Sequence, residues 1–260
     1  MNLFLHSIGT DYKHPVISVG DSLEKGTEPV DMVLTNPPFG KKSSFIIIGA
    51  DGKSRTDRIS YNRQDFWVTT SNKQMNFVQH VYSMLKEDGR AAVVVPDNVL
   101  FEGGAGERIR RTLLQRCDVH TLLRLPTGIW YSTGVKANVL FFDKKPATKT
   151  PATKEIWVYD LRSNRSFSIR QNPIRPENLT DFIQAYHVDD RTLRKETNLF
   201  RRFGYSEILE RDKANLDIQW QLKSAHAVKN ETPQVLMKEI LNDLEEAMRE
   251  FAEAGKEIRR

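Results

Sequence analysis

Cysteine and long apolar runs are the features that this chain of 260 residues has least of. Its one cysteine, Cys117, excludes a disulfide framework and a site built from clustered cysteines, and we expect no metal site. The setting of Cys117, "LLQRCDVH", favours a buried small apolar residue over a nucleophile. No apolar stretch approaches the roughly 20 residues of a membrane-spanning helix. The start, "MNLFLHSIGTD", lacks the basic region and cleavage site of a signal peptide, so we expect a cytoplasmic protein without membrane contact.

The charge balance is mildly basic. The 39 Lys and Arg residues exceed the 34 Asp and Glu residues and give a net charge of +5, which weakly favours an anionic partner. The length suits one large domain, or one domain with an appendage, and the 39% hydrophobic composition is typical of a globular protein.

Short apolar runs bounded by turn residues recur through the first part of the chain and predict strands. The six predicted strands are 14–21, 31–36, 90–97, 118–126, 136–144 and 155–161. Most are too continuously apolar to have one face in water, which indicates a sheet covered on both sides. The stretches 71–89, capped by Ser71, and 106–116 have helical spacing between the strands. Strands that alternate with helices predict an α/β domain with a mostly parallel sheet.

This alternation ends near residues 143–155, where "DKKPATKTPATKE" predicts an exposed loop. We therefore expect three segments, namely the α/β part at 1–160, an irregular and partly helical connection at 161–230, and a C-terminal amphipathic helix at 231–260. The apolar stripe of that helix comprises Leu236, Ile240, Leu244, Ala247, Met248 and Phe251.

The stretch "TNPPFGKKSS" follows the predicted strand at 31–36 and carries the main functional signal. The carboxyl end of a buried parallel strand opens into the crevice where α/β proteins bind ligands. Because proline fixes φ, Pro37 and Pro38 hold the Asn36 side chain and the Pro37 carbonyl pointing the same way. These two acceptors could take both hydrogens of an amine on a planar ring, and Phe39 could stack on that ring. The pattern favours alkyl transfer to the amino nitrogen of a base, glutamine or similar substrate, because the acceptors stabilise the charge that develops on nitrogen.

The alternative interpretation of Asn-Pro-Pro is a rigid loop without chemistry. Its context argues against this, because upstream "VISVGDSL" ends another predicted strand in Asp21, placed to hydrogen-bond a nucleoside ligand. Taken alone, Asp21 would be an ordinary turn residue.

Three longer stretches occur with "TNPPFGKKSS" in the order typical of one family. They are "RQDFWVTTSNKQMNFVQHVYSMLKEDGRAAVVVPDNVLFEGGAG", "CDVHTLLRLPTGIWYSTGVKANVLFFDKKP" and "ANLDIQW". Over roughly residues 1–220 the chain resembles the M (modification) subunits of type I restriction–modification systems, which are adenine-N6 DNA methyltransferases using S-adenosylmethionine.

The resemblance implies roles for particular residues. Asn36, Pro37, Pro38 and Phe39 would form the catalytic turn, and Asp21 with Leu23 would lie by the adenine of the cofactor. Residues 1–160 would be the catalytic-side part of the methyltransferase domain. The implied partners are double-stranded DNA and the specificity and restriction subunits of the type I complex.

The target base must leave the duplex to reach such a turn, because its amine is otherwise paired inside the stack. The loop 41–72 has a composition suited to phosphates and splayed bases. For any single one of its residues, a solvated loop with an aromatic anchor on the core is an equal alternative. The loop carries Lys41, Lys42, Lys53, Arg55, Arg58 and Arg63 interleaved with Tyr61, Phe66 and Trp67.

One part of a methyltransferase is missing from the sequence. The family places a glycine-rich turn after its first strand and an acidic residue after its second, and "FEGGAG" precedes a helix elsewhere, so we interpret it as a structural turn. We therefore expect a Rossmann-like S-adenosylmethionine-dependent methyltransferase sheet lacking its first two strands, with a C-terminal helical tail. The missing strands would lie between 14–21 and 31–36, so the chain alone should expose strand edges and be inactive.

Two other functions stay open at the level of sequence. An RNA or protein-glutamine methyltransferase uses related Asn-Pro-Pro turns but lacks the longer stretches quoted above. A catalytically silent DNA-binding or scaffold fragment would retain those stretches. Measuring whether DNA, RNA or protein is methylated distinguishes the DNA methyltransferase from the first alternative. Measuring cofactor binding distinguishes it from the silent fragment.

Overall fold

The computed structural model describes most of the chain up to Trp220. The described residues are 6, 8, 17, 19–40, 61–130, 135–162, 167–169, 172–220, 237 and 248, with the backbone alone of 44–48 and 54–58. The chain divides into two compact units, Met1–Ile218 and Gln219–Arg260. In the described ranges no helix combines the length and apolarity needed to cross a membrane, and no cluster of His, Cys, Asp or Glu side chains is arranged to hold a metal ion.

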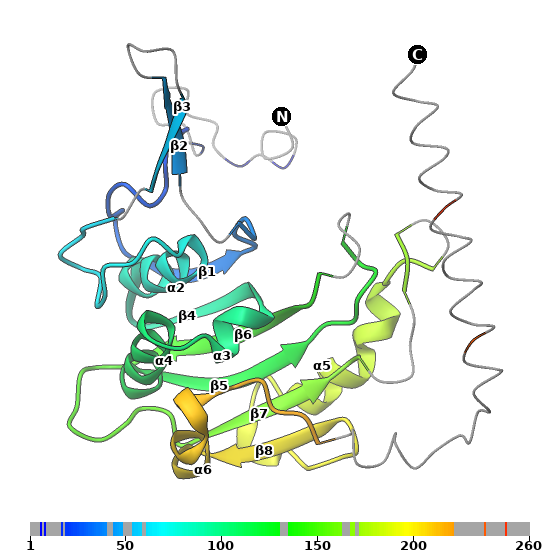
Figure 1. The fold of residues 1–260 in the computed structure, drawn as a ribbon. Coiled ribbons are helices and arrows are strands. Elements are labelled where there is room, and N and C mark those ends of the chain that lie inside the picture. Colours follow the sequence, from blue (N-terminus) through cyan, green and yellow to red (C-terminus); the bar gives the residue numbers. More distant parts are fainter. Residues whose placement is uncertain are drawn as a thin grey trace. The chain divides into compact units, whose positions relative to one another are not determined.

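A mixed sheet of six strands forms the centre of the first unit (Figure 1). From edge to edge its order is β1, β4, β6, β5, β7 and β8. The strands are β1 (Val30–Thr35), β4 (Leu85–Pro96), β5 (Cys117–Arg124), β6 (Ala137–Lys144), β7 (Glu155–Asp160) and β8 (Phe200–Gly204).

The predicted α/β class is confirmed, but the sheet is less parallel than expected. The pairs β1–β4 and β5–β7 are parallel, whereas β4–β6, β5–β6 and β7–β8 are antiparallel. The loop between β5 and β6 contains no crossover helix in its described residues, and such a connection returns the chain antiparallel to the strand it has left. Strand β6 thereby separates β4 from β5, which run in the same direction.

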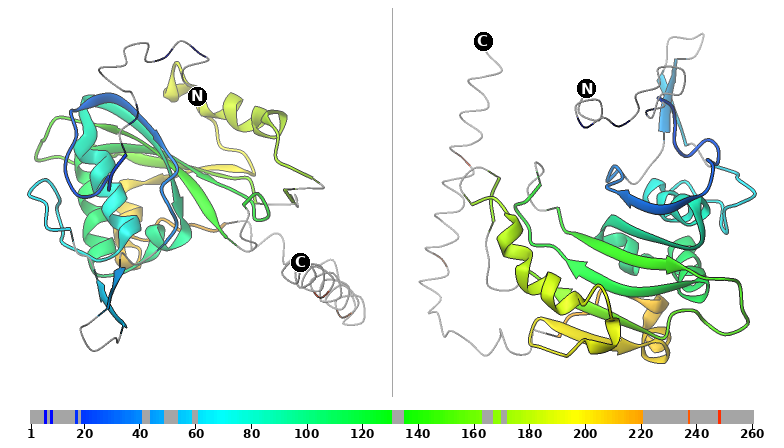
Figure 2. Two further views of the ribbon diagram at one scale, coloured as in Figure 1. Left: turned by 90° about the horizontal axis from the view of Figure 1, so that it is seen from above. Right: turned by 180° about the vertical axis from the view of Figure 1, so that it is seen from behind.

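Helices cover both faces of the sheet, as the continuous apolar strands predict (Figure 2). Helices α2, α3 and α4 lie on one face, and α5 lies on the other. On the α5 side, Phe182 and Tyr186 pack against Leu123, Phe141 and Tyr159 of the strands. The helices are α2 (Lys73–Met84), α3 (Asp97–Phe101), α4 (Ala105–Arg116), α5 (Thr180–Tyr186) and α6 (Tyr205–Glu210), with 3-10 turns η1 (Pro176–Leu179), η2 (Arg191–Leu193) and η3 (Asp212–Ala214).

Helices α2 and α4 correspond to the two predicted helices. The expected cap of the first, Ser71, is wrong by one residue, because the side chain of Asn72 accepts from the backbone N–H groups of Gln74 at 3.0 Å and Met75 at 3.3 Å. Helix α2 also ends earlier than predicted, since β4 begins directly at Leu85.

Strand β1 is an edge strand with one uncovered face. Val33 points into the core and is 7% exposed, but Met32 is 44% exposed and Leu34 is 72% exposed. Among the described strands, only β4 pairs with β1. An open edge beside exposed apolar side chains is the arrangement expected of a sheet that continues on this side.

Two segments differ from the expectations. Of the predicted strand at 14–21, the described residues Ile17, Val19, Gly20 and Asp21 are not in a strand, and Val19 is 98% exposed. The expected loop at 41–72 contains an antiparallel hairpin, β2 (Ser44–Ile48) with β3 (Ser54–Arg58). The Asp-Gly pair between these strands is the sequence signal for such a hairpin.

The first unit also runs past the boundary expected at residue 160. It does so because β8 extends the sheet alongside β7, and because Ala214, Leu216 and Ile218 are buried within the unit. The predicted helix at 231–260 lies outside the described residues, apart from Met237 and Met248, which are helical.

Candidate active site

The Asn-Pro-Pro-Phe turn leaves the carboxyl end of β1, where Thr35 pairs with Val93 of β4. Asn36 is exposed, Pro37 is buried and Phe39 is partly buried. Among the described residues, no hydrogen bond engages the Asn36 side chain. The turn therefore has the predicted position at a strand end, with the amide oxygen of Asn36 available to a ligand from the solvent side.

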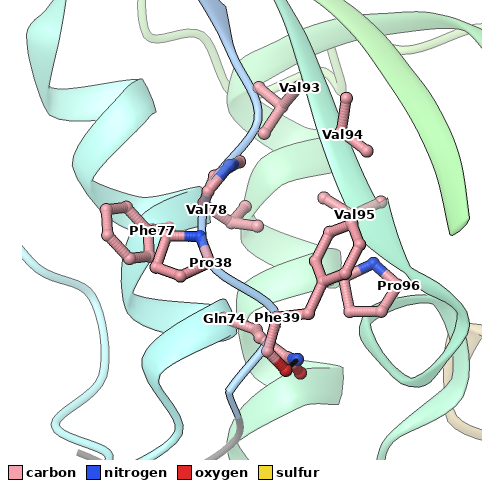
Figure 3. A pocket seen from close by; sticks show the side chains of 10 residues that line it. Pro38, Phe39, Gln74, Phe77, Val78, Val93, Val94, Val95 and Pro96 are labelled. Atoms are coloured by element: carbon pink, nitrogen blue, oxygen red, sulfur yellow. Dashed lines mark hydrogen bonds between the residues drawn. The ribbon is translucent and has the colours of Figure 1, made fainter. Parts of the chain in front are cut away.

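The inner side of the turn is packed rather than hollow (Figure 3). Pro38 lies by Phe77 of α2, and Phe39 lies beside Pro96 at the end of β4. The cavity enclosed between them has a volume of about 10 Å³, close to the minimum for one water molecule and far too small for a base. A planar substrate must therefore approach the turn from its open side.

Phe39 is restrained at both its ring and its main chain. Its ring meets the indole of Trp130 edge to face, with centroids 5.3 Å apart and planes at 80°. Its carbonyl oxygen accepts a hydrogen bond from the side-chain amide of Gln74, on the first turn of α2. Neither Trp130 nor Gln74 is predicted from the sequence, because both come from other elements and neither residue type is a local signature of such a contact.

Asp21 and Leu23 form a turn next to α2. The Asp21 carboxylate accepts from the backbone N–H of Leu23 at 2.9 Å and from the Tyr61 hydroxyl at 2.6 Å, and the Tyr61 bond is the main reason that the pKa of Asp21 is lowered. The Leu23 side chain is fully buried. This arrangement fits the ordinary role of Asp as a turn residue, and the remaining lone pairs of its carboxylate could still accept from a ligand.

Arg63, predicted to contact DNA, is held inside the protein. Its side chain is 7% exposed and pairs with Asp65 at 2.5 Å. The guanidinium also donates to the Lys25 carbonyl at 3.2 Å, contacts Nδ1 of His80 at 3.0 Å and lies 4.3 Å from the centre of the Phe66 ring. Burial and this guanidinium lower the pKa of His80, so a neutral imidazole accepts from Arg63. These contacts favour a structural role in which Arg63 fastens the loop to α2.

The structure brings some predicted site residues together and leaves others undescribed. Tyr61 links the predicted DNA loop to Asp21, and Arg63 links Leu23 to α2, the helix that also contacts the Asn36 turn. For Arg55 and Arg58 only the backbone, in β3, is described. Lys41 and Lys42 lie outside the described residues.

The "FEGGAG" turn is braced by one arginine. Arg110, which is 3% exposed, donates to the carbonyls of Val99 at 2.9 Å, Glu102 at 2.8 Å and Lys213 at 2.7 Å. A side chain at Gly103 would come within 3.0 Å of Lys213. These internal contacts match a structural turn.

A larger cleft, of about 580 Å³, lies at the other end of the strands from the Asn36 turn. Its lining includes Asp118 and Glu155, at the amino ends of β5 and β7, and none of the predicted site residues. Because β1, β4, β5 and β7 run in the same direction, the Asn36 turn lies at the carboxyl edge, where α/β folds place their ligands. The turn is therefore the better candidate for an active site.

Comparison with known proteins gives an independent result. A sequence model of the family described as N-6 DNA methylase matches residues 1–230. The EcoKI methylase subunit of a type I restriction enzyme, from Escherichia coli K12, is 35% identical over 99% of this chain and 53% of its own length. The StySJI methylase subunit from Salmonella typhimurium is 36% identical with the same coverage. The chain thus spans about half the length of the curated relatives it matches.

Solved structures show the same fold. The crystal structure of the EcoKI M protein matches with a TM-score of 0.70 at 35% identity, over 96% of this chain and 55% of that one. A type I methyltransferase subunit from Streptococcus thermophilus matches in fold with a TM-score of 0.62 at 23% identity, over 82% of this chain and 43% of that one.

Proposed function

The chain belongs to the N-6 DNA methylase family, and from this premise we propose that it is the catalytic-side part of an adenine-N6 DNA methyltransferase, the modification subunit of a type I restriction–modification system. The observation that carries the proposal is the Asn36 turn at the carboxyl end of β1, which combines an amide oxygen that no described residue engages with the restrained aromatic ring of Phe39.

The residues of the turn act on the amine of a flipped adenine. The Asn36 amide oxygen and the Pro37 carbonyl accept its two hydrogens, which directs the nitrogen lone pair out of the ring system. Phe39 stacks on the base and holds it in place. As the nitrogen attacks, the two acceptors stabilise its developing positive charge, and the amine then loses one proton to solvent.

S-adenosylmethionine supplies the methyl group when it is bound, and Asp21 with Leu23 lies on the adenine side of its site. The free lone pairs of the Asp21 carboxylate fit a hydroxyl or amine donor of such a ligand. The chain has no glycine-rich turn that would receive the methionine part. We propose that the cofactor binds only when another segment, from the same or another polypeptide, supplies that turn.

Double-stranded DNA is the proposed substrate, and the loop 41–72 is the proposed contact with the opened strand. Lys41, Lys42, Arg55 and Arg58 are the candidates for phosphate contacts, whereas Arg63 holds the loop on α2 and Tyr61 holds it on Asp21. Replacing Lys41, Lys42, Arg55 or Arg58 should therefore reduce the salt dependence of DNA binding, whereas replacing Arg63 should change it little.

We propose the specificity and restriction subunits of a type I complex as protein partners, since the relatives are named as methylase subunits of type I restriction enzymes. The apolar stripe in the helix predicted at 231–260 would join a helical bundle with the specificity subunit. Deleting residues 233–260 should then abolish co-purification with that subunit without unfolding the first unit. Retention of the complex after the deletion would contradict this assignment.

The decisive experiment compares wild type and Asn36→Ala in the enzyme completed with the missing segment. We expect N6-methyladenine in DNA from the wild type and a loss of order 100-fold or more in the variant, with cofactor and DNA binding largely intact. Asn36→Asp serves as the matched variant, because it keeps the size and one acceptor but adds a charge. Near-normal turnover by Asn36→Ala would remove the turn from the mechanism.

A further inference from the structure

A chain of side-chain amides lies directly behind the catalytic turn. Gln74 is 5% exposed, and its Nε2 donates to the carbonyl oxygen of Phe39 (Figure 3). Among the described residues, this hydrogen bond is the one that joins the turn to α2. Because it binds the main chain of Phe39, it acts on the position of the turn and not only on one side chain.

The orientation of the Gln74 amide is set by Asn98 in α3. Nδ2 of Asn98 donates to Oε1 of Gln74 at 2.6 Å. An amide has one acceptor end and one donor end, so with its oxygen engaged by Asn98, Gln74 must present its N–H to Phe39. The same Nδ2 donates to a carboxylate oxygen of Glu102 at 3.2 Å, which holds Asn98 in the donating orientation.

Glu102 also fixes the helix that carries Gln74. Its carboxylate oxygens accept from Nδ2 of Asn72 at 3.1 Å and 3.0 Å, and Asn72 caps the amino end of α2. One carboxylate thus restrains both the start of α2 and the amide that orients Gln74. Accepting a hydrogen bond at Oε1 polarises the Gln74 amide, so the bond from Asn98 strengthens the N–H that Gln74 donates to Phe39.

We propose that Gln74 is a positioning residue for methyl transfer, held by Asn98 and Glu102, which keeps the catalytic turn at a fixed distance from α2. The inference rests on the proposed function of the turn. Pro37 and Pro38 fix the local shape of the turn, but a rigid turn can still move as a body against the sheet. The Gln74 bond removes that motion, so the Asn36 acceptor and the Phe39 ring stay where the amine must be received.

Gln79 provides a matched control for a purely structural role. It lies on the same helix and is 1% exposed. Its amide donates to the Val68 carbonyl at 3.0 Å and accepts from the Val68 N–H at 2.9 Å, and it makes no contact with the catalytic turn among the described residues. Gln79→Glu therefore introduces the same change of chemistry, at similar burial, in a contact that does not reach Phe39.

The test variant is Gln74→Glu, which keeps the size of the side chain. As a carboxylate it faces the Phe39 carbonyl with no proton to donate, and it lies near Glu102, so its pKa should be raised above the usual range. Once protonated it regains a donor. The defect should therefore be largest near pH 8 and diminish as the pH falls towards 6.

Carbonyl NMR reads the contact without any need for activity. In the 260-residue chain, Phe is followed by Gly only at Phe39-Gly40 and Phe203-Gly204. Labelling Phe with carbonyl ¹³C and Gly with ¹⁵N gives two correlated signals, of which the second is an internal reference in β8. We expect Gln74→Glu to shift the Phe39 carbonyl at pH 8, to restore it at lower pH, and to leave the Phe203 signal in place. An unshifted Phe39 signal would overturn the contact.

Kinetics of the completed enzyme test whether the contact matters to the reaction. We expect kcat of Gln74→Glu to fall by about 10- to 100-fold at pH 8, the order expected for a misplaced reacting group, with KM for S-adenosylmethionine little changed. Part of the loss should be recovered at pH 6, and Gln79→Glu should show no such pH-dependent loss. A shifted carbonyl with unchanged kcat, or the same kinetic defect in Gln79→Glu, would overturn the positioning role. A completed wild type without methyl transfer would overturn the proposed function itself.

Discussion

The ring of Phe39 and the indole of Trp130 meet edge to face, with centroids 5.3 Å apart. Phe39 follows β1, at the edge of the sheet, whereas Trp130 lies in the connection between β5 and β6. The pair therefore joins the Asn36 turn to the β5–β6 connection, although neither β5 nor β6 pairs with β1. The Nε1 atom of Trp130 is buried and makes no hydrogen bond in the described part of the chain, so the aromatic contact is its main described link to the turn.

Replacing Trp130 by Ala should weaken capture of the flipped base without removing the Asn36 acceptor. An edge-to-face aromatic pair contributes about 0.5–1.5 kcal/mol, so base binding should weaken by roughly 2- to 12-fold in the completed enzyme. The fluorescence of 2-aminopurine at the target position measures this. Trp130→Phe keeps an aromatic edge and should retain most of the signal. Equal fluorescence for Trp130→Ala and wild type would show that Phe39 does not depend on Trp130.

The loop that carries Trp130 requires glycine at residue 128. Gly128 has φ of +82°, and a Cβ there would lie 1.9 Å from the carbonyl oxygen of Phe167. Gly128→Ala must therefore move backbone, and we expect it to lower the free energy of unfolding by about 2 kcal/mol or more. Gly204→Ala is the control, because no atom lies within 4 Å of its Cβ position and its φ is −70°. Urea midpoints measure both variants, and equal midpoints would contradict the strain argument.

Sequence patterns predict the elements of this fold that carry their own run of apolar residues, and they miss the elements that depend on pairing with distant strands. The continuous apolar runs give β4, β5, β6 and β7, because a strand buried on both faces needs apolar residues throughout, and they also give β1, whose second face is exposed in the structure. Strand β8 is missed, since in "FRRFG" only Phe200 is fully buried and the strand is defined by its pairing with β7. The direction of β6 is also missed, because strand pairing joins residues that are far apart in the sequence.

The same distinction holds at the site. The position of Asn36 at a strand end follows from local residues, and the structure places it there. Arg63 has the local character of a phosphate contact, a basic residue among aromatics, yet its side chain is 7% exposed because Asp65 and α2 surround it. Gln74 and Asn98 have no local signature at all, since their roles arise only when α2 and α3 pack behind the turn.

Asp97 should make stability depend on pH in acid. Its carboxylate accepts hydrogen bonds from Arg162 at 2.6 Å and from Asn138 at 2.8 Å. These bonds join the start of α3, directly after β4, to β6 and to the segment that follows β7. Burial raises the pKa of Asp97, but the hydrogen bonds from Arg162 and Asn138 outweigh it and hold the pKa below 3.8. A lowered folded-state pKa means that the ionised carboxylate stabilises the fold above about pH 3.8.

Asp97→Asn should therefore cost about 1.5–3 kcal/mol of unfolding free energy near pH 7, the usual range for hydrogen bonds to a charged group. The difference between the variant and the wild type should shrink as the pH falls below 3.8 and through the lower pKa of the folded state. Urea unfolding of both proteins between neutral pH and pH 3 measures this difference. A difference that stays constant across that range would assign the effect to shape and not to charge.

The open edge of β1 leads to the last prediction. Leu34 is 72% exposed on that strand, so Leu34→Lys should hardly change the stability of the chain alone. If a further segment must cover this face to complete the cofactor site, a lysine there places an unpaired charge in the new interface and should block assembly. Val188→Lys is the matched control, because Val188 is 70% exposed and lies outside the sheet.

The experiment is calorimetry with S-adenosylmethionine on the 260-residue chain, alone and mixed with the part of a curated relative that the chain does not span. We expect no binding by the chain alone, binding by the mixture, and loss of that binding for Leu34→Lys but not for Val188→Lys. The reason is geometric: in the proposed site Asp21 receives only the adenine side of the cofactor, and no described segment covers β1 to receive the methionine part. Micromolar binding by the chain alone would show that the cofactor site is already complete and lies elsewhere.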